Sequence, residues 1–422
     1  MSEILARAAA LRDLVRGDSA TSHSRPLAEA VLACCEELVA AGEFTPALEL
    51  VAKTLSLRSL PEEWVMRLEL VRATALRVAG QYEAALEKVR AIARDHSGIL
   101  ETEKPERHRL QISEAACLWR MNRVDEAVER LSSLRAELLT RPDSSLLASC
   151  TLELSSAEIF RGRHSVARGF VLEAIVSARR SGNKFVEAIA LDNLGRLERS
   201  LCRWASALEA GQEALRILEG NGNRVQANVT RRVLGILLWK QGRLDIAQET
   251  IDACLREARA IGHTTNEEYT LLLAGLVALH RGDHEQARLA FQATGRPDPL
   301  SRPSLLAYEY VGDEYLERGR AEDALEHYDL VWPMALALVP KGDIVAELRR
   351  RRAEAMYLLG RHDEAHTEAE AALAHCRELG DRYEEAATYR VLALSAAAVG
   401  RAAEAKKWFE QGFAFYDDIE TP

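Results

Sequence analysis

The amphipathic pattern of the chain begins with a single helix. The pattern of apolar and charged residues from Glu3 to Arg16 predicts one amphipathic helix. The polar stretch from Gly17 to Pro26 predicts a loop. Beyond this loop, short turn elements separate longer stretches that are rich in alanine and leucine. Because alanine and leucine are strong helix formers, the pattern predicts helices throughout.

The predicted turns recur at a nearly constant interval. Their central residues lie 37 to 42 residues apart, which is the spacing of stacked two-helix units. The central residues are Gly42, Gly80, Asn122, Gly162, Cys202, Gly242, Gly282, Gly319, Gly360 and Gly400. These turns predict ten helix pairs.

Two further positions keep the same register in all ten units. The fifth residue after each turn is alanine, from Ala47 to Ala405. The seventh residue before each turn is small, as at Cys35, Ser155 and Gly275. Two helices approach closely only where side chains are short, so these positions predict tightly packed antiparallel pairs.

Glycine also marks the predicted ends of several second helices. Glycine adopts the left-handed conformation that closes a helix at low cost. The residues concerned are Gly182, Gly222, Gly262, Gly342 and Gly380.

The small residue, the glycine turn and the following alanine resemble the tetratricopeptide repeat over residues 26–418. Some of the family's large positions are filled, by Tyr82, Phe291, Tyr315, Tyr328 and Phe409, but the proline that often ends the family's second helix is mostly absent. The repeat of about 40 residues is similar to arrays in bacterial maltose-type activators, peptide-sensing regulators and animal spindle-orientation adaptors. The resemblance implies an all-α fold, a right-handed α-solenoid of about ten helix pairs.

This pattern divides the chain into four segments. Residues 1–25 are expected to form a capping helix and loop, 26–294 repeats one to seven, and 304–422 repeats eight to ten. Residues 295–303 between them contain three prolines, which predict a shortened seventh pair and a bend in the superhelix. Pro333 predicts a kink in the second helix of the eighth pair.

The C-terminal helix is expected to lack a cap. Phe413, Phe415 and Tyr416 lie near its end, and we expect them to meet a partner, a second copy or a further domain, because a terminal repeat otherwise leaves an apolar face uncovered. Self-association through this helix is therefore one prediction.

Composition and charge exclude several classes of function. The formal charge of −10 argues against a nucleic-acid binder, which needs a basic surface. The seven scattered cysteines fit neither a disulfide framework nor a metal-binding CxxC pair. The start has no signal-peptide core, and no apolar run of about 18 residues could cross a bilayer. We expect a soluble cytoplasmic protein without membrane contact.

Short motifs in the ninth pair resemble chemical sites. Asp363–His366 spells a helicase box, but Ala365 is the repeat alanine and no phosphate loop accompanies it. His362 and His366 have a spacing that could hold zinc, yet no third ligand has a motif spacing, so surface histidines are the preferred interpretation. The run Arg349–Arg352 resembles a nucleic-acid or nuclear-import patch, but on a helix the four side chains point in four directions, so a solvated helix with one or two groove-facing arginines is the preferred interpretation. We expect no metal, no cofactor and no enzymatic activity.

The resemblance also implies where a partner would bind. In the superfamily, the first helices of successive pairs line a concave groove, and residues at fixed offsets before each turn face the ligand. These offsets select Asp192, Arg196, Arg199, Arg232, Trp239, Lys240, Tyr269, Leu272, Arg350 and Arg390 as site residues, with Glu309, Asp313, Glu347 and Glu354 among the acidic positions of the later repeats. The resemblance thus implies a basic stripe around an exposed Trp239, suited to an acidic or carboxylate-bearing peptide. The alternative is that these charges are solvated and pair along their own helices.

Two functions are favoured by the sequence, and a third, weaker alternative is an enzyme with a site formed between repeats. The first is a scaffold or adaptor that binds a protein or peptide in the groove. The second is a regulatory sensor that binds a small molecule or signalling peptide and controls a transcriptional or signalling effector. The sequence does not identify the partner.

Overall fold

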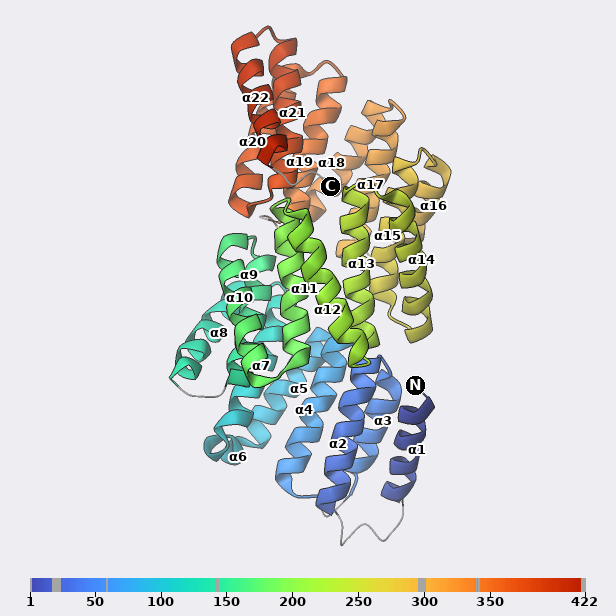
Figure 1. Ribbon diagram of the computed structural model, residues 1–422, viewed down its shortest axis with the longest axis vertical. Helices are drawn as coiled ribbons and strands as arrows, with labels where there is room; N and C mark the ends of the chain where they lie inside the picture. Colours follow the sequence, from blue (N-terminus) through green and yellow to red (C-terminus); the bar gives the residue numbers. More distant parts are fainter. Residues whose placement is uncertain are drawn as a thin grey trace.

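The computed structural model is built of α-helices only, within the residues that it describes (Figure 1). Those residues are 2–16, 24–57, 60–140, 144–294, 301–338, 340 and 342–418. They form 22 helices and no strand, which confirms the predicted all-α class. Most of the predicted N-terminal loop, and residues 295–300 of the predicted bend, lie outside the described ranges.

Twenty of the helices form the ten predicted pairs. The pairs are α2 (Ser24–Ala41) with α3 (Phe44–Leu55), α4 (Glu62–Val78) with α5 (Tyr82–Asp95), α7 (Lys104–Arg120) with α8 (Val124–Leu139), α9 (Ser144–Phe160) with α10 (His164–Ser181), α11 (Lys184–Ser200) with α12 (Trp204–Gly220), α13 (Arg224–Lys240) with α14 (Leu244–Ile261), α15 (Thr264–His280) with α16 (His284–Thr294), α17 (Arg302–Glu317) with α18 (Ala321–Leu338), α19 (Asp343–Leu358) with α20 (His362–Leu379), and α21 (Arg382–Ala398) with α22 (Ala402–Asp418). The two remaining described helices are α1 (Ser2–Arg16), which packs Ala8, Leu11 and Val15 against the first pair, and α6 (Ser97–Thr102), inserted before the third pair.

Every turn within a pair passes through one residue in the left-handed region. Eight of these residues are glycines with φ between 72° and 86°, a conformation that glycine adopts without a Cβ clash. The other two are Asn122 (φ 63°) and Cys202 (φ 57°). The left-handed residue reverses the chain direction, so that amides of the turn donate to carbonyls of the preceding helix. For example, the Arg243 amide donates to the Leu238 carbonyl at 2.9 Å.

The glycines expected to close second helices behave as predicted at four of five positions. Those four are Gly182, Gly222, Gly262 and Gly380, all with positive φ. The prediction is wrong for Gly342, which has φ −90° and precedes α19. The reason is that α18 already ends at Leu338, so Gly342 begins the next helix instead of closing the previous one.

The small positions hold the two helices of each pair together. The ten small residues before the turns are all buried, and so are nine of the ten alanines after them; Ala405 in the last pair is partly exposed. In the fifth pair, a Cβ added to Gly195 would lie 3.1 Å from the Ala207 carbonyl oxygen. Short side chains therefore set the helix separation, as the register predicts.

Overfilling this contact should be costly. We expect Ala247→Leu on α14 to lower the free energy of unfolding by about 1 to 3 kcal/mol, because Ala247 is completely buried. The control is Glu249→Leu, which adds the same side chain at an exposed position of the same helix and should change stability by no more than about 0.5 kcal/mol. Equal losses in chemical denaturation would contradict the register.

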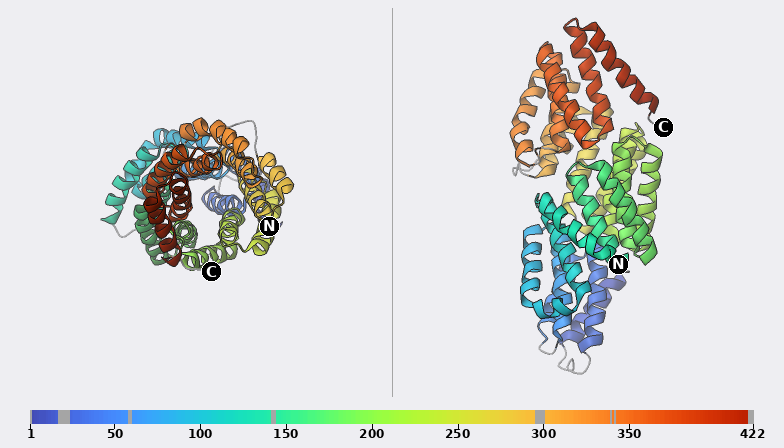
Figure 2. Two further views of the ribbon diagram at one scale, coloured as in Figure 1. Left: turned by 90° about the horizontal axis from the view of Figure 1, so that it is seen from above. Right: turned by 90° about the vertical axis from the view of Figure 1, so that its left-hand side faces the viewer.

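The pairs wind into a superhelix whose successive turns touch. Seen along the long axis, the helices form a ring (Figure 2). Contacts join pair one to pair six (Gly42 with Val225), pair three to pair eight (Asn122 with Leu338), pair four to pair nine (Gly162 with Leu379) and pair five to pair ten (Trp204 with Tyr383). One superhelical turn therefore takes five pairs, and residues about 200 positions apart become neighbours.

The proline-containing segments differ in their effect. The helix α16 ends at Thr294 after 11 residues, the shortest second helix described. The helix α18, by contrast, continues through Pro333 as one element. The bend and the kink stay predictions. Among the described helices, none has both the length and the apolar character needed to cross a membrane.

Candidate functional site

The first helices of pairs five to ten carry a dense group of charged side chains. We call this group the inner charged surface. It consists of Asp192, Arg196 and Arg199 on α11, Arg232 and Lys240 on α13, Arg302, Glu309 and Asp313 on α17, Asp343, Glu347, Arg350 and Arg351 on α19, and Asp381 and Glu384 at the start of α21. Asp343 and Glu347 of pair nine act electrostatically on Arg199 of pair five. Charges from distant pairs therefore share one region.

The earlier helices supply most of the cations. Arg196 Nε donates to Asp192 Oδ2 at 2.8 Å, and this ion pair lies along a single helix. Arg232 Nε donates to the amide oxygen of Asn266 at 2.7 Å, and its guanidinium lies 4.9 Å from the ring centroid of Tyr269. The structure thus brings Arg196, Arg232 and Tyr269 together, on three successive first helices.

Two of these guanidinium groups have no carboxylate partner. Arg199 makes no hydrogen bond or ion pair with any described residue, and Arg232 bonds only to the neutral Asn266. Burial lowers the pKa of Arg199, and the neighbouring charge of Arg196 lowers it further. The same two causes lower the pKa of Arg232 to about 10. A bound anionic group would favour the charged form of both guanidinium groups and so raise both pKa values.

The later helices supply most of the carboxylates, and Arg351 lies among them. Its guanidinium contacts Asp313 at 2.7 Å, Glu309 at 2.8 Å and Glu347 at 3.1 Å. Burial raises the pKa of Glu347 to about 7, and the nearby Glu384 carboxylate adds to the effect. Burial also raises the pKa of Glu309 well above its usual range. This part of the surface holds more negative groups than one arginine can compensate.

Further ion pairs involve carboxylates of α19 and α21, and these carboxylates complete the acidic part of the inner charged surface. Arg350 contacts Glu384 at 2.8 Å and Glu354 at 3.2 Å, and Arg390 also pairs with Glu354. The Arg390 side chain is 56% exposed. Both predicted arginines are therefore paired with carboxylates of the chain itself.

The other predicted site residues differ in what they present. Lys240 Nζ lies 3.5 Å from the ring centroid of Tyr383 and so joins pair six to pair ten. Trp239 is partly buried, and its Nε1 donates to His280 Nδ1 at 3.1 Å. Leu272 is 2% exposed and belongs to the hydrophobic core, so it offers no side-chain surface to a ligand.

The repeat offsets do not select the charged residues at the starts of the first helices. Arg302 Nη2 contacts Asp343 Oδ2 at 2.6 Å, and Asp381 acts on Arg199. These residues precede the offsets that the repeat pattern assigns to the groove. No local signal identifies them, because the winding of the superhelix places them there.

The arginine run on α19 is not the solvated face that we expected. The four side chains, Arg349 to Arg352, are only 10 to 27% exposed. Arg349 contacts Glu368 at 3.3 Å, and Arg352 contacts Asp329 at 2.8 Å. Neighbouring helices provide carboxylates in each direction, so all four cations are paired.

The histidines of the ninth pair also differ from the sequence interpretation. His366 is 4% exposed and not a surface residue, because α22 of the next pair covers it. His362 is partly buried, with its ring centroid 5.3 Å from that of Tyr357.

The aromatic residues of α22 divide between surface and interior. Phe409 and Phe413 are 55% and 59% exposed, with ring centroids 5.0 Å apart. Phe415 is 7% exposed and packs in one cluster with Trp204 and Leu237, so its expected contact with an external partner is wrong. Self-association through this helix stays a prediction.

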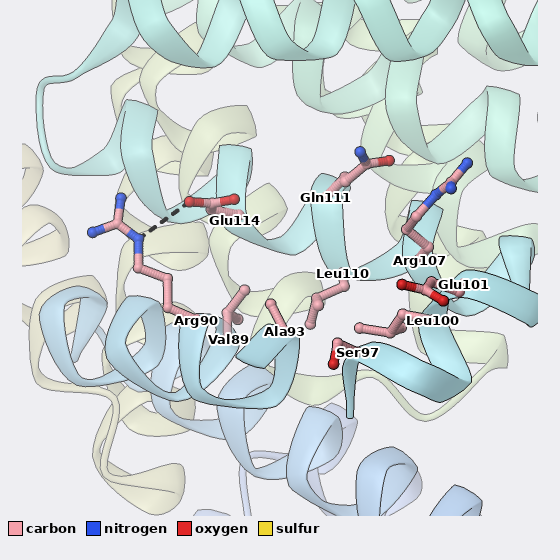
Figure 3. Close-up of a pocket in the computed structure, with 10 residues that line it drawn as sticks. All are labelled: Val89, Arg90, Ala93, Ser97, Leu100, Glu101, Arg107, Leu110, Gln111 and Glu114. Atoms are coloured by element: carbon pink, nitrogen blue, oxygen red, sulfur yellow. Dashed lines mark hydrogen bonds and ion pairs between the residues drawn. The ribbon is translucent and has the colours of Figure 1, made fainter. Parts of the chain in front are cut away.

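A separate pocket lies beside the inserted helix α6. It has a volume of about 320 Å³ and lies between α5, α6 and α7 (Figure 3). Val89, Leu100 and Leu110 form its apolar part, and Arg90 Nε pairs with Glu114 at 3.2 Å at one side. The pocket lies outside the predicted groove.

Comparison with known families identifies the repeat. The family profile described as "Tetratricopeptide repeat" matches residues 344–418, which comprise most of pairs nine and ten. The other eight pairs share the same turn, small positions and alanines. Residues 344–418 therefore form tetratricopeptide repeats, within a solenoid of helix pairs of the same architecture. A search of curated protein sequences found no match.

Solved structures resemble the chain over most of its length. A Rap protein complexed with Competence and Sporulation Factor has a TM-score of 0.55 and 15% identity, covering 82% of this chain and 100% of that one. The Rap conjugation gene regulator of plasmid pLS20, in complex with the Phr* peptide, has a TM-score of 0.53 and 16% identity, covering 73% and 94%. NprR with its cognate peptide NprX has a TM-score of 0.50 and 14% identity, covering 71% and 87%. At such identities the likeness shows the fold.

Proposed function

We propose that the protein is a peptide-binding regulator that holds an extended peptide against its inner charged surface. Unlike an enzyme, it would act through binding. The observation that carries the proposal is the pair Arg199 and Arg232, two partly buried cations without a carboxylate partner. The folds with which the chain aligns include two solved with a peptide and one solved with Competence and Sporulation Factor, and the two peptide complexes support the same class of ligand.

The distribution of charge indicates the chemistry of the ligand. Arg199 and Arg232 favour an anionic group, such as an Asp or Glu side chain or a free C-terminal carboxylate. The carboxylates around Arg351 and Arg350 favour basic or hydrogen-bond-donating groups further along the peptide. A peptide with an acidic end and a basic or polar end would therefore match both parts of the surface.

Sensing is favoured over scaffolding by the winding of the superhelix. The inner charged surface is built from pairs five to ten, and these pairs also contact each other across superhelical turns, as Lys240 and Tyr383 do. A ligand bound there touches several pairs at once. Its binding energy can therefore change the relative positions of distant pairs and control an effector.

The test is peptide selection against the intact protein. A displayed library of random peptides is selected on the wild type, and each recovered peptide is titrated against the double variant Arg199→Glu/Arg232→Glu. We expect recovered peptides to share an acidic group and to bind the variant roughly ten- to a hundredfold more weakly, a loss of about 1.4 to 2.8 kcal/mol. Binding to the wild type should also weaken as salt rises.

The control is a double variant with the same change in net charge, made on second helices, away from the inner charged surface. Arg180→Glu/Arg256→Glu replaces two exposed arginines of α10 and α14 and should leave affinity nearly unchanged. If both double variants lost affinity equally, overall charge would explain the binding. If neither lost affinity, the peptide would bind elsewhere and the proposal would fail.

A further inference from the structure

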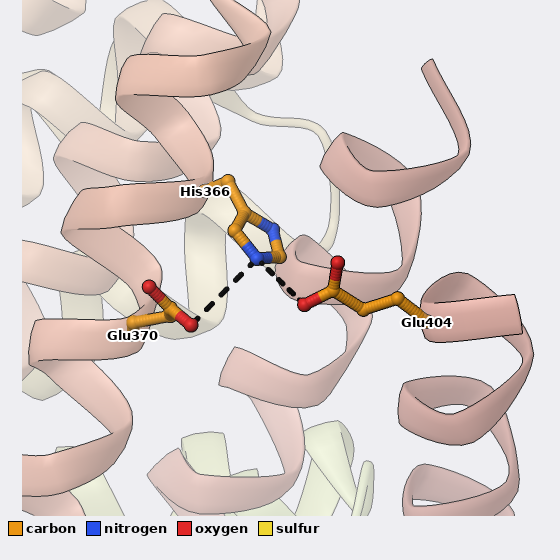
Figure 4. A group of neighbouring side chains, drawn as sticks. All are labelled: His366, Glu370 and Glu404. Atoms are coloured by element: carbon orange, nitrogen blue, oxygen red, sulfur yellow. Dashed lines mark hydrogen bonds and ion pairs between the residues drawn. The ribbon is translucent and has the colours of Figure 1, made fainter. Parts of the chain in front are cut away.

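Three potential metal ligands meet between the outer helices of the last two pairs. His366 and Glu370 lie one turn apart on α20, and Glu404 lies on α22. His366 Nε2 is 3.1 Å from Glu404 Oε1 and 3.8 Å from a Glu370 Oε1 atom, and one ligand atom of each residue lies within 4.8 Å of the others. Figure 4 shows the three side chains directed toward a common point.

A neighbouring serine can hold the imidazole in the tautomer that metal binding needs. Ser395 Oγ lies 3.1 Å from the Leu392 carbonyl oxygen, to which it can donate its one hydrogen, and 3.0 Å from His366 Nδ1. With its hydrogen on the carbonyl, the serine accepts from Nδ1–H. In that tautomer the lone pair of Nε2 points at the two glutamates.

Three potential ligand atoms in this arrangement can share one cation. A proton on Nε2 would satisfy Glu404 at 3.1 Å, but it would not reach Glu370 at 3.8 Å with hydrogen-bond geometry. A metal ion can satisfy all three ligands. The two carboxylates together carry the charge that balances a divalent ion.

The distances also suit a small ion with tetrahedral coordination. Zinc binds histidine nitrogen and carboxylate oxygen at about 2.0 to 2.2 Å, so its ligands lie roughly 3.3 to 3.5 Å from one another. The two distances from His366 Nε2, 3.1 and 3.8 Å, lie on either side of this value, and the two carboxylate oxygens lie within 4.8 Å of each other. The surrounding contacts fit as well, because the buried histidine is held by Ser395 in the way that metal-bound histidines are held by a partner on the other nitrogen.

Access and competing contacts are compatible with binding. The side chains of Glu370 and Glu404 are 56% and 34% exposed, so an ion and a completing water molecule can reach them. The second oxygen of Glu404 lies 3.9 Å from Arg401, whose nearer carboxylate is that of Asp363 at 3.0 Å. The oxygen of Glu404 that faces His366 has no such neighbour in the ion pairs of the described residues.

We propose that His366, Glu370 and Glu404 bind one zinc ion. The ion would join α20 of the ninth pair to α22 of the tenth and fasten the last repeat onto the array. This site is separate from the inner charged surface, so it stands independently of the peptide proposal.

The test is a titration of zinc chloride into the full-length, chelator-treated protein, followed by calorimetry. We expect one ion per chain and an increase in melting temperature with zinc. Magnesium at the same concentration should bind far more weakly, because it prefers oxygen ligands only. Absence of zinc binding would overturn the proposal and leave His366 as a side chain hydrogen-bonded to Glu404.

Variants identify the ligands. Glu370→Gln and Glu404→Gln should each weaken zinc binding roughly tenfold or more, and Ser395→Ala should do so by about tenfold. The control is Glu378→Gln, an exposed position of the same helix, which should leave the affinity unchanged. Because Glu370 is largely exposed, its substitution should not disturb folding. Zinc binding that survives both glutamate substitutions would place the ion elsewhere and overturn the assignment.

Discussion

Replacing Arg351 with alanine is expected to lower the free energy of unfolding by about 3 to 5 kcal/mol, as removal of one partner from a buried ion pair usually does. Arg351 is 8% exposed and contacts the carboxylates of Glu309, Asp313 and Glu347. Without the guanidinium, these three carboxylates remain close together with no positive charge among them. Their mutual repulsion and the cost of burial then act on the folded state alone.

The loss should depend on pH in a defined direction. Burial already raises the pKa values of Glu309 and Glu347 in the folded protein, the latter to about 7. A carboxyl group whose pKa is higher in the folded protein than in the unfolded chain stabilises the fold at low pH. This contribution is lost as the pH rises through the pKa of the folded protein. Removing Arg351 raises these pKa values further, so the deficit of the variant should be small near pH 5 and large near pH 8.

Urea denaturation of both proteins at pH 5 and pH 8 measures this effect. The control is Arg349→Ala, whose single ion pair is 27% exposed on the arginine side and should contribute no more than about 1 kcal/mol. Equal losses for the two variants, or a loss for Arg351→Ala that is the same at both pH values, would contradict the arrangement of the acidic side.

Replacing Phe291 with alanine should also cost about 3 to 5 kcal/mol, through the cavity that it leaves. Phe291 is fully buried at the seventh pair, and its ring occupies the space in front of Gly275. A Cβ on Gly275 would lie 2.3 Å from the nearest ring carbon, closer than any real contact. We therefore expect Gly275→Ala alone to cost about 1 to 3 kcal/mol by overpacking.

The two substitutions should not be additive. Once the ring is gone, an alanine at position 275 meets no obstacle and improves the helix by about 0.5 to 1 kcal/mol. Gly275→Ala should therefore change from destabilising in the wild type to neutral or stabilising in the Phe291→Ala background. A double-mutant cycle in urea measures this coupling. Leu289→Ala, 57% exposed on the same helix, is the control and should change stability by about 0.5 kcal/mol or less. Simple additivity would show that the ring does not fill this position.

Local features of the chain could be predicted because the information lies within a few residues. The left-handed turn at Gly242 needs only a glycine followed by a helix start, and the burial of Ala247 needs only its distance from that turn. Where the local pattern was ambiguous, as at Gly342, the prediction was wrong, because the preceding helix had already ended.

The candidate site was predicted only in part. The offsets from the repeat placed Arg199, Arg232 and Glu347 on first helices, and the structure brings these residues into one charged region. The same offsets included Leu272, which belongs to the core. They also missed Arg302 and Asp343, whose ion pair forms only because two neighbouring pairs are stacked.

The sequence by itself determined the helix pairs, their number and the small contacts within them, because a turn and its flanking helices interact over fewer than about 40 residues. The tertiary structure decided how the pairs wind. The rotation from one pair to the next is small, and no single residue specifies it, yet after five pairs it places Trp204 against Tyr383 and closes one turn of the superhelix against the next. Burial of His366 beside Glu404 likewise depends on the stacking of two repeats. The two proposed sites therefore form only when the helix pairs are stacked, whereas the helix pairs themselves are specified by the local repeat pattern.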